Sequence, residues 1–410
     1  MTAASPTASP EPGLLRALRD GDWLTAERAR IFTIAWLGVS VVVAVAWIGL
    51  SRHGLDILGK PIGTDFISFW TASRIALSGR PSQVYDVAVH HAAQTQPFGR
   101  EVGYYAFFYP PIFLLICLPL AGLPYLASLA AWLAATGAAY AKVVRGFLGG
   151  RGGWVAVFAF PAVLINLGHG QNAFLSAALF GGAVLIWDRR PFLAGILIGC
   201  LAYKPQLGLL IPIALLAAGR WRTIAGAAAA VAALAAASLA AFGVETWRAF
   251  IAASPLARAA LEQGLVGDAK MQSVFAAARL LHGGLGLAYA VQVVTALAGA
   301  AALVAMQRKA PRAPAEGPAL VAASLLASPF LLDYDLILLA IPLAWLTAQG
   351  LKTGFRPYEK TVLAAAYIAP ALTRTIASAT GVPLGPVAVA AVFILVLRRW
   401  AEPIDATSAA

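Results

Sequence analysis

The stretch GTDFISFWTASRIALSGRPSQVYD, residues 63–86, stands between the first hydrophobic span of the chain and a long series of others. It carries a carboxylate, Asp65, among aromatic residues at the start of a segment with amphipathic character. A plain channel has no evident need for a large polar loop of this kind after its first span. A membrane enzyme that acts on lipids at the outer surface does. We therefore predict that residues 51–105 form a first extracytoplasmic loop containing amphipathic helices.

The composition is that of a protein that crosses the membrane several times. Hydrophobic residues make up 60% and charged residues 12% of the 410 positions, whereas soluble proteins have roughly 45–50% apolar and about 25% charged residues. A membrane span needs about 20 mostly apolar residues. We therefore predict an all-α polytopic membrane protein with 11–13 membrane segments, in one transmembrane domain over residues 31–400. The candidate segments are 31–50, 106–122, 125–141, 154–168, 171–187, 190–203, 205–219, 223–243, 285–306, 317–331, 334–350, 361–378 and 383–398.

The net charge of +12 is distributed in short Lys and Arg clusters at the ends of apolar segments. That pattern follows the positive-inside rule for cytoplasmic loops and gives no reason to expect a nucleic-acid partner. It places the N-terminus in the cytoplasm, with residues 1–30 predicted as a disordered basic tail and residues 401–410 as a C-terminal tail. The richness in Ala, Gly and Arg favours the plasma (inner) membrane of a bacterium.

One segment conflicts with this topology. Residues 106–141 must begin outside and end inside, yet they are long enough to read as two spans. Either one half is re-entrant, or the basic residues that follow, 142–151, lie outside despite their charge. Both alternatives stay open at this point.

The same topology places the polar interruptions of the apolar series on one side of the membrane. The loops 169–172, 203–206, 247–284 and 329–335 join residues 51–105 on the outer side. Ionisable residues at membrane depth are costly and are functional by default. The candidate site residues are Asp65, Arg74, Tyr109, His169, Gln171, Asn172, Lys204, Asp333 and Asp335.

Each candidate also has a simpler explanation. Asp65 could cap the helix that follows it, because Asp is a favoured N-cap residue, and Arg74 could extend along an interfacial helix. The pair His90 and His91 lies on a polar stretch and is expected to be solvated. Tyr109 could simply start a helix, and Lys204 could reach the membrane interface. A polar hairpin turn would explain His169, Gln171 and Asn172, and helix capping would explain Asp333 or Asp335.

A set of short motifs stands in the order seen in a known family. The motifs are G-T-D-F at 63–66, V-Y-D at 84–86, F-Y-P-P at 108–111, G-Q-N at 170–172, A-G at 194–195 followed by K-P at 204–205, M-Q-S-V-F at 271–275 and S-P at 328–329 with D-Y-D at 333–335. On these residues the chain resembles glycosyltransferase family 87, whose members include mycobacterial mannosyltransferases that use polyprenol-phosphate-mannose. The resemblance covers roughly residues 60–340. In place of a histidine that such members carry near the late S-P motif, this chain has acids and Tyr334.

The resemblance implies a GT-C-like helix bundle and an enzyme that moves a mannose-like hexose from a polyprenyl phosphate to a hydroxyl of a lipid or glycan. It also implies that Asp65 is the catalytic aspartate, and Asp65 suits a general base for the acceptor hydroxyl. Lys204 and Arg74 are expected to bind the donor phosphate. Direct, inverting transfer needs no metal or other cofactor, and none is predicted. The residues expected to contact sugar or acceptor are Tyr109, His169, Gln171, Asn172, Asp333 and Asp335.

Two other functions are considered. A secondary transporter or a lipid or glycan flippase would explain broken helices and buried polar residues, but it explains neither the large first loop nor the clustering of polar residues on one side. A membrane acyltransferase or a polymerase of surface glycans would also act on lipids. An acyltransferase usually relies on a histidine in the membrane, and His169, the best candidate, has no convincing partner in the sequence.

Overall fold

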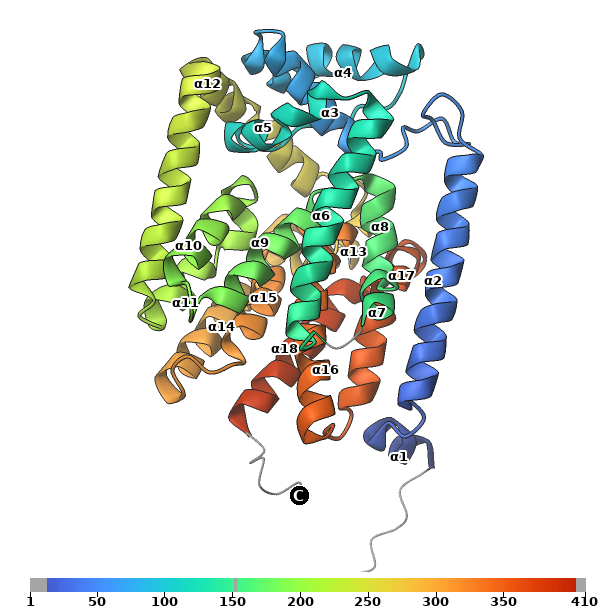
Figure 1. Ribbon diagram of the computed structural model, residues 1–410, viewed down its shortest axis with the longest axis vertical. Coiled ribbons are helices and arrows are strands. Elements are labelled where there is room, and N and C mark those ends of the chain that lie inside the picture. The colour runs from blue at the N-terminus through green and yellow to red at the C-terminus, as the bar shows by residue number, and fades with distance from the viewer. Residues whose placement is uncertain (1–12, 151–152, 403–410) are drawn as a thin grey trace, which may run out of the picture.

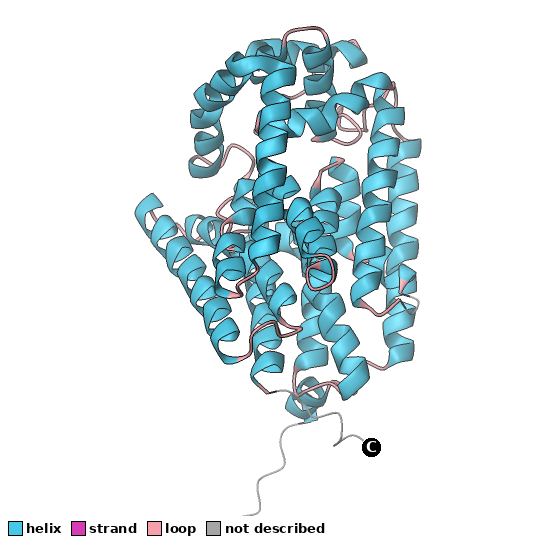
Figure 2. Ribbon diagram, turned by 60° about the vertical axis from the view of Figure 1, so that its left-hand side comes forward, coloured by secondary structure: helices cyan, strands magenta, loops and turns pink. Residues whose placement is uncertain are grey.

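The computed structural model describes residues 13–150 and 153–402, and these fold into an elongated bundle of helices (Figure 1). No strand occurs among these residues, and Figure 2 shows helices joined by loops. The helices α1 and the end of α18 lie at one end of the bundle, called here the terminal end. The helices α3, α4 and α5 lie at the other, called here the loop end (Figure 1).

In the described part of the chain, seven helices are long and apolar enough to cross a membrane, which confirms the predicted all-α polytopic architecture. They are α2 (Ala26–Gly49), α6 (Tyr125–Phe147), α12 (Trp221–Glu262), α14 (Leu285–Lys309), the 3-10 helix η7 continued by α16 (Asp333–Thr353), α17 (Glu359–Thr380) and α18 (Leu384–Ala401). Their mean hydropathy is 1.2 or higher, so lipid is the favourable solvent for their outer faces.

Shorter helices lie between the long ones or at the two ends of the bundle (Figure 1). They are α1 (Gly13–Asp20), α3 (Phe66–Leu77), α4 (Val87–Thr95), α5 (Pro111–Cys117), α7 (Trp154–Phe158), α8 (Pro161–His169), α9 (Ala173–Ile186), α10 (Pro191–Gly199), α11 (Ile211–Ala217), α13 (Val274–Leu280) and α15 (Glu316–Ala327). Single 3-10 turns extend several of them: η1 (Pro81–Tyr85), η2 (Gln96–Phe98), η3 (Leu118–Gly122), η4 (Cys200–Tyr203), η5 (Pro205–Gly208) and η6 (Asp268–Lys270).

Residues 106–141 contain one helix that is long and apolar enough to cross a membrane, α6. The short pair α5 and η3 packs against α3 at the loop end, and α6 alone runs toward the terminal end (Figure 1). Pro110 and Pro111 begin α5, and Pro119 and Pro124 interrupt the chain before α6, because proline cannot continue a helix from within. In this segment only α6 is long enough to span a membrane, which is the arrangement that the first alternative, a re-entrant first half, requires.

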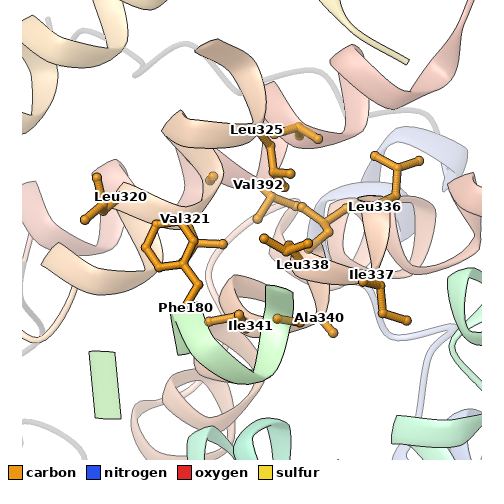
Figure 3. Close-up of a cluster of buried hydrophobic side chains, with 14 of the residues drawn as sticks. Phe180, Leu320, Val321, Leu325, Leu336, Ile337, Leu338, Ala340, Ile341 and Val392 are labelled. Carbon is orange, nitrogen blue, oxygen red and sulfur yellow. The ribbon is translucent and has the colours of Figure 1, made fainter. Parts of the chain in front are cut away.

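The hydrophobic core lies around α15, every residue of which is buried. A helix that is apolar all round is typical of the centre of a bundle. Figure 3 shows this core where α15, α9 and α18 meet the start of η7 and α16, with Phe180, Val321 and Ile341 among the packed side chains. The acids Asp333 and Asp335 begin η7, so this packing fixes their backbone.

Two predictions about the chain ends and the first loop need correction. Residues 13–30 are not disordered: α1 packs on α17, where the amide of Tyr358 donates to the carbonyl of Arg19 over 2.6 Å. Its Leu residues at 14, 15 and 18 and its Arg residues at 16 and 19 recur at helical spacing, which suits an amphipathic helix. Residues 1–12 and 403–410 lie outside the described residues. In the first loop, α3 is buried on most sides and is a core element of the loop end.

His90 is also buried rather than solvated. Its Nδ1 lies 2.8 Å from the carbonyl oxygen of Val84, and the rings of Tyr104 and Phe107 stand against it. Burial disfavours the charged imidazolium and lowers the pKa of His90 from 6.5 to about 4. The first loop is therefore held in part by a neutral histidine.

We expect the stability of the loop end to fall in mild acid. The unfolded ring binds a proton near pH 6.5 and the folded ring only near pH 4, so the contribution of His90 is complete above pH 6.5 and is lost as the pH falls to 4. The total is about 3 kcal/mol, at about 1.4 kcal/mol per pKa unit. Thermal unfolding between pH 4 and 7 should show a smaller loss for His90→Gln than for the wild type. His282→Gln, at an exposed position, should behave like the wild type; equal slopes for all three proteins would contradict the prediction.

Candidate active site

A cavity of about 520 Å³ lies beneath the first loop. Its polar lining comes from segments far apart in the chain, and its apolar lining comes from aromatic residues after α4 and from the last part of α12. The polar residues are Asp65, Ser68, Tyr109, Gln171, Lys204, Gln206, Lys270, Tyr334 and Asp335; the apolar and aromatic ones include Tyr104, Tyr105, Phe108, Leu256, Ala257, Ala260, Leu261, Leu265, Val266 and Leu332. A pocket with an apolar wall and a few convergent polar groups is the usual form of a ligand site.

Asp65 is directed toward this cavity instead of capping its helix. It precedes α3, yet its side chain makes no hydrogen bond to the backbone of that helix. Its Oδ2 lies 3.1 Å from Nζ of Lys270 and 3.6 Å from Nδ1 of His169, and the side chain is 17% exposed. Nε2 of Gln171 lies 3.4 Å from the same oxygen. The simple capping explanation therefore does not hold.

Two glycines bring the segment of Asp65 against the segment of His169. Gly170 has φ +62°, and a Cβ there would lie 2.6 Å from Cβ of Phe66. Only glycine adopts that conformation without strain and leaves room for such close contact with Gly63. As a result, the amide of Asp65 donates to the carbonyl of His169 over 3.0 Å. The turn that carries the motif G-T-D-F therefore packs directly against the turn that carries G-Q-N.

Opposing effects act on the Asp65 carboxyl. Burial disfavours its charged form, but the ammonium of Lys270 and the imidazole of His169 outweigh burial and hold the pKa of Asp65 well below its usual range. An opposite charge within about 4–6 Å has this effect in general. Asp65 is consequently an ionised carboxylate, able to accept a proton.

A second lysine–carboxylate pair lies across the cavity. Nζ of Lys204 is 2.6 Å from Oδ1 of Asp335, and these side chains are only 3% and 4% exposed. Both cavity lysines also approach the ring of Tyr334, with Nζ of Lys204 at 5.4 Å and Nζ of Lys270 at 5.3 Å from its centre. Such contacts with an aromatic face stabilise ammonium groups. The site therefore presents two ammonium groups around one tyrosine ring.

Gln171 links the two sides of the cavity. Its Nε2 donates to the hydroxyl of Tyr334 over 3.1 Å, and its Oε1 accepts from the hydroxyl of Tyr109 over 3.3 Å. Oε1 also accepts from the amide of Asn172 over 2.9 Å. Because both ends of the amide are used, its orientation is fixed.

The structure brings together five of the nine predicted site residues around the cavity: Asp65, Tyr109, Gln171, Lys204 and Asp335. His169 contacts Asp65 from behind and does not line the cavity. Asn172 is fully buried next to Gln171. Asp333 is directed elsewhere, with its Oδ2 3.7 Å from Nη1 of Arg374.

The structure does not bring Arg74 to the cavity. Arg74 is exposed on the outer face of α3, where its guanidinium lies over the ring of Trp70 at 4.8 Å, and it does not line the cavity. The helical periodicity turns this residue away from Asp65, which lies at the opposite end of the helix. We therefore expect Arg74→Gln to leave the transfer rate and the donor KM within about twofold of the wild type, as for most exposed substitutions. A tenfold rise in the donor KM of Arg74→Gln would instead show that Arg74 takes part in donor binding.

Two features of the site were missed in the sequence. Lys270 lies in η6, within the predicted outer loop 247–284; the polar run D-A-K-M-Q-S around it was the available signal. The last part of α12 lies in the same predicted loop, but α12 continues past a bend at Gly243 (φ +74°) and through Pro255 to Glu262. Apolar residues at helical spacing after Pro255, at positions 256, 257, 260 and 261, were the signal for this wall.

Comparisons with known proteins agree with the sequence resemblance. The model of the family described as "Glycosyltransferase family 87" matches residues 107–329. No curated protein matches the chain significantly, and neither does a solved structure. The matched range contains Tyr109, Gln171, Lys204 and Lys270, which line the cavity.

Proposed function

Because this chain belongs to glycosyltransferase family 87, it is a membrane glycosyltransferase, and we propose that it moves a mannose-like hexose from a polyprenyl phosphate to a hydroxyl of a lipid or glycan. One observation carries the proposal: a single cavity joins an ionised carboxylate, two ammonium groups and an apolar wall. These are the groups that a charged phosphate, a reacting hydroxyl and an isoprenoid chain require.

The proposed reaction is a direct displacement. Asp65 accepts the proton of the acceptor hydroxyl, the acceptor oxygen bonds to the anomeric carbon, and the bond from that carbon to the phosphate oxygen breaks with its electron pair on the phosphate. Attack opposite the leaving group inverts the configuration. Lys204 and Lys270 stabilise the phosphate charge. No metal is required, because the phosphate is already an activated leaving group.

The remaining candidates are proposed to hold the sugar or the acceptor. Tyr109 and Gln171 present a hydroxyl and an amide to the cavity, and Asp335 shares Lys204 with the phosphate. The isoprenoid chain would lie along the last part of α12, where Leu256, Ala260 and Leu261 form the wall. His169, Asn172 and Asp333 then act behind the lining residues, by fixing their positions.

The proposed location is the plasma membrane of a bacterium, with the loop end facing away from the cytoplasm. Basic residues at the ends of α6, α14 and α18 support this orientation: Arg145, Lys309 and Arg399 lie in the last turns of these helices, which end toward the terminal end (Figure 1). Positive charge marks the cytoplasmic side. Family membership favours this function over the transporter or flippase considered above.

The test uses purified protein in nanodiscs with a panel of polyprenyl-phosphate sugars, matched nucleotide sugars and a membrane-lipid extract. Mass spectrometry of the lipid and glycan products identifies both the sugar and the acceptor. The expected result is product from one or more polyprenyl-phosphate sugars. Product from nucleotide sugars only, or from none of the donors, would show that the proposed donor class is wrong.

A further inference from the structure

The two lysines of the cavity are held very differently. Lys204 is almost fully buried against Asp335 at 2.6 Å. Lys270 is 12% exposed, lies on the short turn η6 and reaches Asp65 over a longer distance, 3.1 Å. A lysine ammonium is a point charge on a flexible stem with rotatable donors, so Lys270 can exchange one anionic partner for another at small cost.

We propose that Lys270 is a counter-ion shared between Asp65 and the donor phosphate, so that donor binding draws the lysine from the carboxylate and frees Asp65 to act as the base. The inference rests on the proposed function and adds an order to it: the acceptor hydroxyl is activated only when the donor is present. Lys270 lines the cavity together with Asp65, so a phosphate in the cavity competes with Asp65 for its ammonium.

The charges balance through the reaction. A sugar linked to polyprenyl phosphate carries one negative charge on its phosphodiester. On transfer, Asp65 gains the acceptor proton and loses its negative charge, while the released polyprenyl phosphate gains one. Negative charge therefore disappears at Asp65 and appears on the phosphate, and an ammonium between them remains paired at every stage. A fixed pair such as Lys204 and Asp335 does not have this property.

The groups that face Asp65 determine how its proton affinity changes. Lys270 from η6 and His169 from α8 lower it, and Gln171 donates a hydrogen bond. The hydroxyls of Tyr105, Tyr109 and Tyr334 lie within electrostatic range of Asp65, and Asp333 lies within range of His169 and Lys270. If the phosphate takes Lys270, Asp65 loses its lysine partner and keeps the contacts with His169 and Gln171, and burial then favours the protonated acid. The base becomes stronger when the donor arrives.

The experiment compares two pH profiles of the wild-type enzyme in nanodiscs, using the donor and acceptor found active in the panel above. One is kcat/KM for the donor, which reports groups of the free enzyme; the other is kcat/KM for the acceptor at saturating donor, which reports the donor complex. We expect the acidic limb of the second profile to lie about 1–3 pH units above that of the first, the usual effect of an opposite charge on a carboxyl. Coincident limbs would overturn the inference.

Two variants provide an independent check. In Lys270→Met the two acidic limbs should coincide, because the shared charge is gone, and kcat should fall because the leaving phosphate is less stabilised. Lys270→Arg keeps the charge and should keep the separation. A merely structural role would lower activity equally at all pH values. If the wild type transfers sugar and the acidic limbs of its two pH profiles coincide, the proposed coupling between donor binding and Asp65 is wrong, but the proposed function still holds. If the enzyme uses none of the donors, the proposed function is itself wrong.

Discussion

Asp65→Asn is expected to lower kcat for glycosyl transfer by about 10²–10⁴-fold, the usual contribution of a positioned general base. The amide keeps the size of the side chain but cannot take the acceptor proton. It also leaves Lys270 without its carboxylate, so the ammonium is free for the donor phosphate. Donor affinity should therefore be unchanged or higher, and the loss should appear in kcat rather than in donor binding.

Asp86→Asn is the matched control for this substitution. Asp86 is an exposed N-cap in the same loop, and its side chain accepts from the amide of Val89 over 3.0 Å. Asparagine is an equally good N-cap residue, so this variant should fold and transfer sugar like the wild type. Donor binding by fluorescence or calorimetry separates the two possible effects at Asp65. An Asp65→Asn enzyme with more than a tenth of the wild-type kcat would mean that another group is the base.

Gly195→Leu is expected to abolish the accumulation of folded protein, the largest structural effect in the chain. Gly195 and Gly199 stand four residues apart on α10 and pack on Gly226 and Ala227 of α12. A Cβ at Gly195 would overlap the backbone carbonyl oxygen of Thr223, and one at Gly199 would lie 2.6 Å from the carbonyl oxygen of Ala227. Small residues with this spacing let two membrane helices approach closely, and no change of rotamer relieves a clash with backbone.

Two alanine variants measure how much stability the protein loses when a Cβ is added at this contact. Gly195→Ala carries the same clashing Cβ and should destabilise the protein by at least the usual cost of overpacking, about 1–3 kcal/mol. Gly286→Ala adds the same methyl group to the exposed helix α14, where no atom lies within 4 Å, and should be neutral or slightly stabilising because alanine is the better helix former. Thermal unfolding followed by size-exclusion chromatography measures both. Equal stability of the two alanine variants would contradict the packing argument.

Much of the fold follows from the sequence because its signals are local. Apolar runs and terminal Arg clusters predicted the long helices, in most cases within a few residues, and α2 begins only five residues before the predicted Ile31. The break at Gly243 and Pro255 hid the last part of α12, because a proline normally marks the end of a helix. The amphipathic pattern of residues 13–20 is likewise too short to distinguish a docked helix from a tail.

Site residues were predictable where a charged side chain stands beside an apolar run. They were not predictable where membership of the site depends on the direction in which a side chain points. Asp65 and Lys204 stand out as charges next to apolar runs, and both line the cavity. Arg74 carries an equally suitable charge. It stands nine positions after Asp65, however, and its side chain points away from the cavity. Lys270 forms its contact with a residue 205 positions earlier, and no local pattern specifies such a pairing.

The pairing of Lys204 with Asp335 also determines when the site can form during synthesis of the chain. The two residues are 131 positions apart, so at about 5–20 residues per second the ribosome makes the lysine roughly 7–26 s before its carboxylate. During that interval the ammonium has no counter-ion, and a bare charge in hydrocarbon is costly. The segment around Lys204 therefore has to remain at the aqueous interface of the nascent chain until Asp335 emerges, and the site closes only after that.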